Sequence, residues 1–172
     1  DILARTSRPV VTVRAPYGLE GTRECLRGIA AAAGKAGAFE AAWEKKLGSF
    51  LPAWEEMKSQ SSGCRLAFVV SEATLPRLLK LRHGHGAPLA TMVKEMGFGI
   101  DLLYYDIHGQ APDLPEGLSD ARVATFRSPW ELERALREGA FQAVYSDMFF
   151  DWRISGAGKA RFSSRDFKMG LE

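Results

Sequence analysis

The turn from Pro16 to Arg23 carries the residue types best suited to binding an anion. It reads Pro-Tyr-Gly-Leu-Glu-Gly-Thr-Arg, follows an apolar run from Pro9 to Val13 that is typical of a strand, and leads into an expected helix from Glu24. A strand that ends in a glycine-bearing turn and opens a helix brings backbone N–H groups and a positive dipole end to the edge of a cleft. The same residues also fit a plain strand–turn–helix joint with Thr22 as the N-cap, so both interpretations stay open.

Two histidines, His83 and His85, are the clearest candidates for holding a metal ion. They are separated by one glycine on a glycine-rich loop, a spacing that can chelate a transition metal. No third ligand lies nearby in the sequence, although Asp106 and His108 could contribute from another strand end. A solvated loop is the simpler explanation of the pair.

Polar side chains follow each expected strand. Open α/β sheets bind ligands at the carboxyl ends of their strands, so this row could form a site, but helix capping and loop solvation explain it equally well. The sequence holds no Walker motif, no Gly-x-Gly-x-x-Gly after a strand and no Gly-x-Ser-x-Gly turn, and the segment from Gly156 to Lys159 lacks the spacing and the hydroxyl of a phosphate loop. The row consists of Ser71, Glu72, Asp106, His108, Arg127, Ser128, Ser146 and Asp147.

These side chains depend for their positions on strands and helices that alternate, with short connections, from residue 64 onward. An apolar helical stripe from Leu89 to Met96 is closed by Gly97, and Ser128 with Glu131 forms a capping box that opens a short helix. Such alternation predicts a Rossmann-like, three-layer α/β domain with a mostly parallel sheet covered on both faces. The expected strands are 64–70, 100–105, 121–126 and 141–145, with a short extended piece at 160–162 and helices at 130–137 and 148–154.

The first 60 residues are expected to form a strand and two helices that link this domain to a neighbouring one. Apolar residues from Leu26 to Ala33, including Ile29, share one face of the first helix, which we expect to dock on a core. Apolar and aromatic residues then recur every three or four positions from Phe39 to Met57, which predicts a long helix with a kink or break at Pro52. The predicted organisation is residues 1–60 as a linking part and residues 61–172 as the Rossmann-like domain.

The charge balance gives no indication of a nucleic-acid or membrane partner. The 23 Lys and Arg residues are scattered among 21 Asp and Glu residues, for a net charge of +2, and no apolar stretch approaches the ~20 residues that span a bilayer. Cys25 and Cys64 are expected to be reduced and buried, which fits a cytoplasmic protein, and two cysteines cannot supply all the thiolates of an iron–sulfur site. The chain begins at Asp1 and is interpreted as an excised piece of a larger protein.

The order of these motifs resembles the nitrogenase component 1 family. The resemblance begins with the strand and the turn from Ala15 to Arg23, which contains Pro-x-Gly-x-x-x-Thr, and continues through the long helix and the strand at 64–70. The segment from Met92 to Phe98 is similar to the family's entry to its next strand, and the tail from Gly158 to Gly170 is similar to its last strand and cluster-facing loop. The family comprises molybdenum–iron protein subunits, their cofactor-assembly scaffold relatives and dark-operative protochlorophyllide reductase subunits.

The resemblance implies a domain of an oxidoreductase subunit that is inactive alone. Family members hold iron–sulfur clusters between Rossmann-like domains and receive electrons from an ATP-dependent iron protein. The implied partners are therefore the remainder of the chain's own subunit, a homologous subunit and an ATP-dependent iron–sulfur reductase protein. The implied cofactor-binding residues, on loops that face the cleft, are Gly21, Thr22, Arg23, Ser163 and Arg165; no catalytic or metal-ligating residue is expected in this chain.

The chain departs from the family pattern at several positions, and these departures favour some branches of the family over others. The cysteines of the family's bridging cluster lie in an N-terminal domain absent here, and its cofactor-ligating cysteine lies upstream of Pro9. The histidine that ligates the cofactor in some members would fall at about Met169, which cannot act as an imidazole. The chain alone is thus expected to bind no cofactor, and a scaffold or second-subunit type fits better than a nitrogen-reducing subunit. The alternative is a self-contained α/β domain that binds a small ligand or nucleotide at its strand ends.

Overall fold

The computed structural model of this chain describes residues 10–13, 15–78, 88–110, 112–114, 116–146 and 152–162. Its internal contacts divide the chain into two compact units, and the boundary falls inside one long helix, between Ala53 and Trp54. The two units are described separately.

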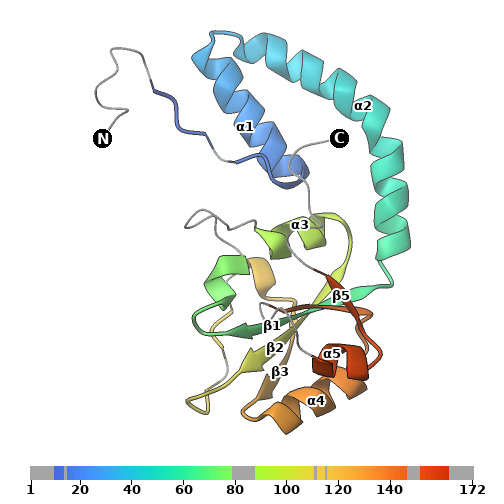
Figure 1. The fold of residues 1–172 in the computed structure, drawn as a ribbon. Helices are drawn as coiled ribbons and strands as arrows, with labels where there is room; N and C mark the ends of the chain where they lie inside the picture. Colours follow the sequence, from blue (N-terminus) through green and yellow to red (C-terminus); the bar gives the residue numbers. More distant parts are fainter. Residues whose placement is uncertain are drawn as a thin grey trace. The chain divides into compact units, whose positions relative to one another are not determined.

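The first unit is built on a helical hairpin. Helix α1 (Gly18–Ala32) is followed by helix α2 (Ala36–Ser61), and both are labelled in Figure 1. Ion pairs link the two helices, since Arg27 Nε donates to Glu40 Oε1 at 2.8 Å and Arg23 lies 3.4 Å from the same carboxylate. Cys25 and Trp43 are both buried in this unit.

Helix α1 begins earlier than the sequence pattern predicts. Gly18, at a positive φ of 70°, is already its first residue, and Tyr17 occupies the N-cap without a side-chain hydrogen bond. Thr22 therefore lies inside the helix, where its hydroxyl donates to the carbonyl of Gly18 at 2.6 Å. The N-cap role expected for Thr22 is wrong, because the conformational freedom of Gly18 lets the chain turn into the helix four residues before it.

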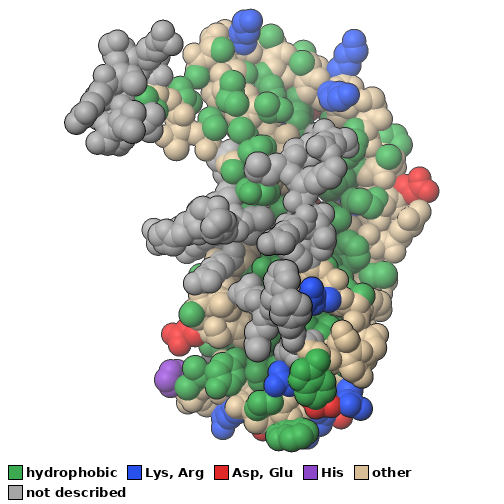
Figure 2. Space-filling model, in the orientation of Figure 1, with side chains coloured by type: hydrophobic (Ala, Val, Ile, Leu, Met, Phe, Trp, Pro, Cys, Tyr) green, Lys and Arg blue, Asp and Glu red, His purple; other side chains and the backbone are tan. Residues whose placement is uncertain are grey.

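Three other expectations for this unit are corrected. Residues 10–13 belong to no strand, and no strand in the described part of the chain pairs with them, which a stable strand would require. Leu26 and Ile29 are 42% and 51% exposed, because the buried face of α1 is the one that carries Gly21, Thr22 and Cys25. Hydrophobic side chains accordingly reach the surface over α1 and α2 (Figure 2). Helix α2 stays helical on both sides of Pro52, so the break expected there is wrong, because the loss of one N–H donor does not end a helix of 26 residues; the kink stays a prediction.

The second unit contains a five-stranded, wholly parallel sheet in the order β3-β2-β1-β4-β5 (Figure 1). This confirms the predicted Rossmann-like α/β fold. The central strand β1 runs beside β2 through seven register pairs, from Arg65 opposite Gly99 to Ser71 opposite Tyr105. The strands are β1 (Arg65–Ser71), β2 (Gly99–Tyr105), β3 (Arg122–Phe126), β4 (Ala143–Ser146) and β5 (Ala160–Phe162).

Hydrophobic layers cover both faces of the sheet, as predicted. Alternate residues of β1 and β2 point to opposite faces, so that Phe68 and Leu102 belong to one core and Ala67 and Leu103 to the other. Helix α3 (Leu89–Glu95) covers the first face, and α4 (Pro129–Glu138) and α5 (Trp152–Gly156) cover the second (Figure 1). Two short 3₁₀ turns, η2 (Leu75–Leu78) and η3 (Glu116–Leu118), pack with the first face.

Helix α4 begins at the predicted N-cap, Ser128, and the Glu131 carboxylate reaches back one residue further than in a standard capping box. The Glu131 N–H donates to Ser128 Oγ at 3.3 Å, and the Glu131 carboxylate accepts from the N–H of Arg127 at 2.6 Å. These bonds fix the chain where it leaves β3, at the edge of the sheet that holds the strand carboxyl ends. In the part of the chain that the structure describes, no helix is both long and apolar enough to cross a bilayer.

Candidate functional site

A cavity of about 380 Å³ lies at the carboxyl ends of β1 and β2. Its wall is formed by residues that follow β1, from Glu72 to Pro76, and by the end of β2 with its loop, from Tyr104 to Asp113. Both segments belong to the second unit. Parallel α/β sheets bind ligands at this edge, so the cavity is the candidate functional site.

Asp106 organises the loop after β2. This side chain belongs to a residue only 5% exposed, and its Oδ1 accepts the backbone N–H groups of His108, Gly109 and Gln110 at 3.1, 2.6 and 3.1 Å. Its Oδ2 accepts from Arg127 Nη2 at 3.0 Å and Nε at 3.2 Å. The loop therefore closes around its own carboxylate, and these N–H groups are not free to bind an anion.

The surroundings of Asp106 set its ionisation. Burial raises the pKa of this carboxyl, but the hydrogen bond from Arg127 and the N–H groups of Gln110 and Gly109 lower it by more. The pKa therefore lies below the ordinary value of 3.8, and Asp106 is an ionised acceptor at neutral pH. Its role is structural, because every one of these contacts is internal to the unit.

The turn after β1 is closed in a similar way. The Ser71 N–H donates to Thr74 Oγ1 at 2.8 Å, and the Thr74 N–H donates to the Ser71 carbonyl at 3.0 Å. The turn contains no glycine, and it places Glu72 in the cavity wall. The turn is therefore not a glycine-rich phosphate loop.

The chemistry of the cavity is acidic and aromatic. Glu72 and Asp113 are exposed carboxylates in its wall, and the exposed His108 lines the same cavity. Tyr104, which is only 8% exposed, forms part of the same wall. Within the described residues no Lys or Arg lines this cavity. The exposed carboxylates of this wall can accept hydrogen bonds.

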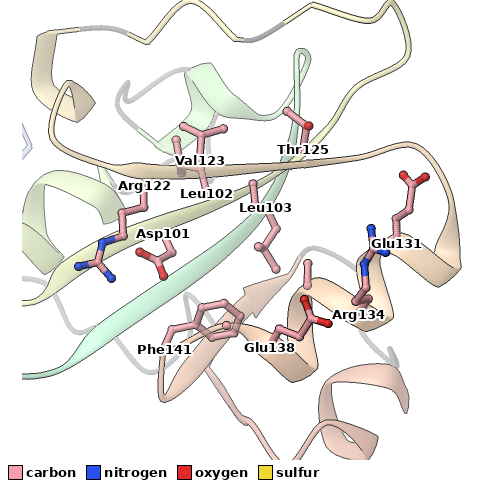
Figure 3. Close-up of a pocket in the computed structure, with 13 residues that line it drawn as sticks. Asp101, Leu102, Leu103, Arg122, Val123, Thr125, Glu131, Arg134, Glu138 and Phe141 are labelled. Atoms are coloured by element: carbon pink, nitrogen blue, oxygen red, sulfur yellow. The ribbon is translucent and has the colours of Figure 1, made fainter.

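A second hollow, of about 340 Å³, runs between β3 and α4 (Figure 3). Its charged groups are spread out, since Arg122 on β3 lies on the opposite side of the hollow from Glu131 and Arg134 on α4 (Figure 3). Glu131 is engaged in capping α4, and the Asp101 carboxylate is paired with Arg65. Because its polar groups do not converge, this hollow is the weaker candidate.

Three of the predicted cofactor-binding residues lie in the first turns of α1. Gly21 and Thr22 are buried, and a Cβ atom added at Gly21 would lie 3.4 Å from the carbonyl oxygen of Ala15. Arg23 is directed to α2, where it lies 3.4 Å from Glu40 and 3.8 Å from Glu44. Their role at a cluster-holding cleft stays a prediction. The other two, Ser163 and Arg165, and the histidines His83 and His85 lie outside the described residues.

The residues predicted at the strand ends have different roles in the structure. It brings Glu72, Asp106 and His108 together at the cavity, whereas Ser128 caps α4 and Ser71 closes its own turn. The sequence analysis missed Tyr104, because in the sequence this residue is only one apolar position of an expected strand. It also missed the pairing of Asp106 with Arg127. Asp113 was also missed, since it falls in a proline-rich loop with no pattern of its own.

The described residues do not supply a donor set for an iron–sulfur cluster. Cys25 is buried on α1, Cys64 is half-buried before β1, and both are free thiols that belong to different units. No group of three or more His, Cys, Asp or Glu side chains that could hold a metal ion occurs within the described ranges. No protein-family model matches the chain, and no curated protein matches it.

Proposed function

We propose that this chain is a Rossmann-like domain of a nitrogenase component 1-like oxidoreductase subunit. In this proposal it works in the cytoplasm, helps to enclose an iron–sulfur cluster and substrate cleft, and is inactive alone. The observation that supports it is the succession of a helical hairpin and a wholly parallel sheet, in the order that the resemblance of the sequence motifs implies. The cluster ligands would come from other parts of the assembly, and the electrons from an ATP-dependent iron protein.

The surface of the helical unit supports a role within a larger subunit. Leu26, Ile29 and Leu51 are 42%, 51% and 39% exposed on α1 and α2, and a partner surface could cover them. The indole Nε1 of Trp43 is buried without a hydrogen-bond partner within the described residues, and an unpaired buried donor lowers the free energy of unfolding. The remainder of the subunit is the cover that we propose for this surface.

The test of this proposal compares the full-length subunit with this chain. Purified without oxygen and together with its homologous partner, the subunit should carry iron and sulfide and should be reduced when an ATP-dependent iron protein and ATP are added. The 172-residue chain treated with iron and sulfide in the same way should retain neither. A full-length subunit free of iron, or a chain that alone retains stoichiometric iron and sulfide, would contradict the proposal.

The cavity favours a second candidate function, that of a self-contained α/β domain that binds a small ligand at its strand ends. Its volume of about 380 Å³ lies in the range of small-molecule sites, and its polar groups converge from two loops. Ligand titration followed by ¹⁵N NMR tests this function directly, because binding should shift the amides around Asp106 first. Unchanged spectra across a chemically varied set of ligands would speak against it.

A further inference from the structure

Helix α2 belongs to both units, and its middle is weakly packed. The structure describes all of this helix, and between the buried residues Trp43 and Ser61 every residue is exposed or half-buried. Residues 51–53 are exposed in succession, and a Cβ atom added at Gly48 would meet no described atom of another segment within 4 Å. Because most helical stability in proteins comes from packing, the middle of α2 gains little of it.

The backbone hydrogen bonding of the same segment is weak as well. Pro52 has no N–H, so the carbonyl of Gly48, four residues before it, lacks the donor that would continue the helix. The Ser49 hydroxyl donates to the Lys46 carbonyl at 2.7 Å, a local bond that competes with the helical pattern. Glycine and proline are also the residues least favourable in a helix interior. Three residues between Gly48 and Pro52 thus weaken the helix, each for its own reason.

The division of the chain into units falls at the same place, directly after Ala53. On the side of the helical unit, Glu40 of α2 is paired with Arg27 of α1. On the side of the sheet unit, the Lys58 carbonyl of α2 packs so closely that it would lie 2.8 Å from a Cβ atom on Gly97. Each end of α2 is therefore held within its own unit, and the weak segment lies between them.

We propose that the segment from Gly48 to Pro52 is a hinge, at which α2 bends and lets the helical unit change its orientation relative to the sheet unit. Sharp bends in helices occur at proline and at Gly/Ser pairs, and this segment contains both. Hinges are short segments that absorb the change in backbone angles while the bodies on either side move intact. The hinge is a property of the fold and is independent of both candidate functions.

Residual dipolar couplings of the full chain, weakly aligned in solution, test whether the two units move independently. With a hinge, the couplings of the two units require alignment tensors of different magnitude, because each unit averages its orientation separately. The double variant Gly48→Ala with Pro52→Ala restores the missing N–H donor and removes the glycine, so one tensor should fit both units. The variant should fold, since it places the residue most favourable for a helix at two exposed positions of α2.

Amide hydrogen exchange measures the opening of the hinge segment itself. Protection of the Leu51 and Ala53 amides should rise about fivefold in Gly48→Ala and at least about a hundredfold in the double variant with Pro52→Ala, as helix propensities imply. Gly37→Ala is the matched control, because it makes the same substitution near the start of α2, where an added Cβ atom also meets no described atom within 4 Å. It should leave these amides and the two tensors unchanged.

Three outcomes would overturn the hinge. The first is a single tensor that fits both units of the unmodified chain. The second is a difference between tensors that persists in the Gly48→Ala, Pro52→Ala variant, since the motion would then arise elsewhere in the chain. The third is a rise in protection in Gly37→Ala equal to that in Gly48→Ala, which would mean that α2 opens as a whole. None of them bears on ligand binding at the cavity or on cluster binding by the full-length subunit.

Discussion

Replacing Gly97 with alanine should destabilise the sheet unit far more than the same change at a matched glycine. Gly97 follows helix α3 at φ +91°, and it ends that helix in a Schellman motif: its N–H donates to Lys94 O at 2.9 Å and the Phe98 N–H donates to Val93 O at 3.2 Å. A Cβ atom on Gly97 would lie 2.8 Å from the carbonyl oxygen of Lys58 on α2. The neighbour is backbone, so it cannot rotate away.

Gly158 provides the control within the same unit. It ends α5 with the same pair of bonds, from its own N–H to Ser155 O at 3.0 Å and from the Lys159 N–H to Ile154 O at 3.2 Å, at φ +70°. Nothing lies within 4 Å of a Cβ atom added there. Gly158→Ala should therefore cost only the left-handed conformation, about 1–2 kcal/mol of unfolding free energy. Gly97→Ala adds the displacement of packed backbone, which costs about 1–3 kcal/mol more.

Urea denaturation followed by circular dichroism measures both free energies of unfolding by linear extrapolation. We expect Gly97→Ala to lower the unfolding free energy by about 2–5 kcal/mol, the sum of the conformational and packing costs. Equal losses in the two variants would refute the close packing of Lys58 on Gly97, and with it the inclusion of the last turns of α2 in the sheet unit.

Three further predictions concern other residues of the sheet unit. Ser128→Ala should cost about 1 kcal/mol of unfolding free energy, because the Glu131 N–H loses its acceptor; an unchanged urea midpoint would argue against this cap. Leu136→Ala should cost about 2–5 kcal/mol by the same assay, since this side chain is fully buried, and a loss below that range would mean a loosely packed second core. The folded state lowers the pKa of Asp106 below its ordinary value of 3.8. The ionised carboxylate therefore contributes fully to the free energy of unfolding above pH 3.8. This contribution is lost as the pH falls through the lower pKa of the folded state. Hydrogen exchange at the Gly109 amide, corrected for its intrinsic pH dependence, should lose protection in that acid range and not near neutrality.

The strands of the sheet could be predicted because they are short apolar runs with clear ends. The run from Leu66 to Val70 is buried by layers on both sides, which leaves a continuous apolar pattern whatever the neighbours are. Helix α4 could be predicted because a capping box is a local signal, complete within Ser128 to Glu131. Both depend only on residues near one another in the chain.

The start of α1 could not be predicted in the same way. The sequence offers Gly18 and Thr22 as competing ways to begin the helix, and the choice depends on how the first turn packs. Once Gly18 opens the helix, Thr22 lies in its first turns and its hydroxyl donates to the Gly18 carbonyl. The strand expected at 9–13 fails for a related reason, because an apolar run forms a strand only where a neighbouring strand is available.

The candidate site could be predicted in its location but not in its chemistry. The strand-end rule leads to Glu72, Asp106 and His108, which do meet at the cavity. The pairing of Asp106 with Arg127, however, depends on β2 and β3 lying side by side, with Tyr105 opposite Phe126. Which strands are neighbours in a sheet depends on contacts between residues far apart in the sequence, so a local sequence pattern does not predict it.

Asp106 organises the loop after β2, at the edge of the sheet where parallel α/β folds often bind their ligands. Strand carboxyl ends supply a crevice, but the sign of the ligand depends on which group occupies the N–H donors of the loops. In this chain Asp106 occupies three of them, and Arg127 neutralises Asp106 from the next strand end. The loop is thereby held by contacts within the sheet unit, and the carboxylates of Glu72 and Asp113 lie in the cavity wall beside it. The fold accordingly supplies the crevice at the strand ends, and one buried carboxylate occupies three backbone donors of the loop that borders it.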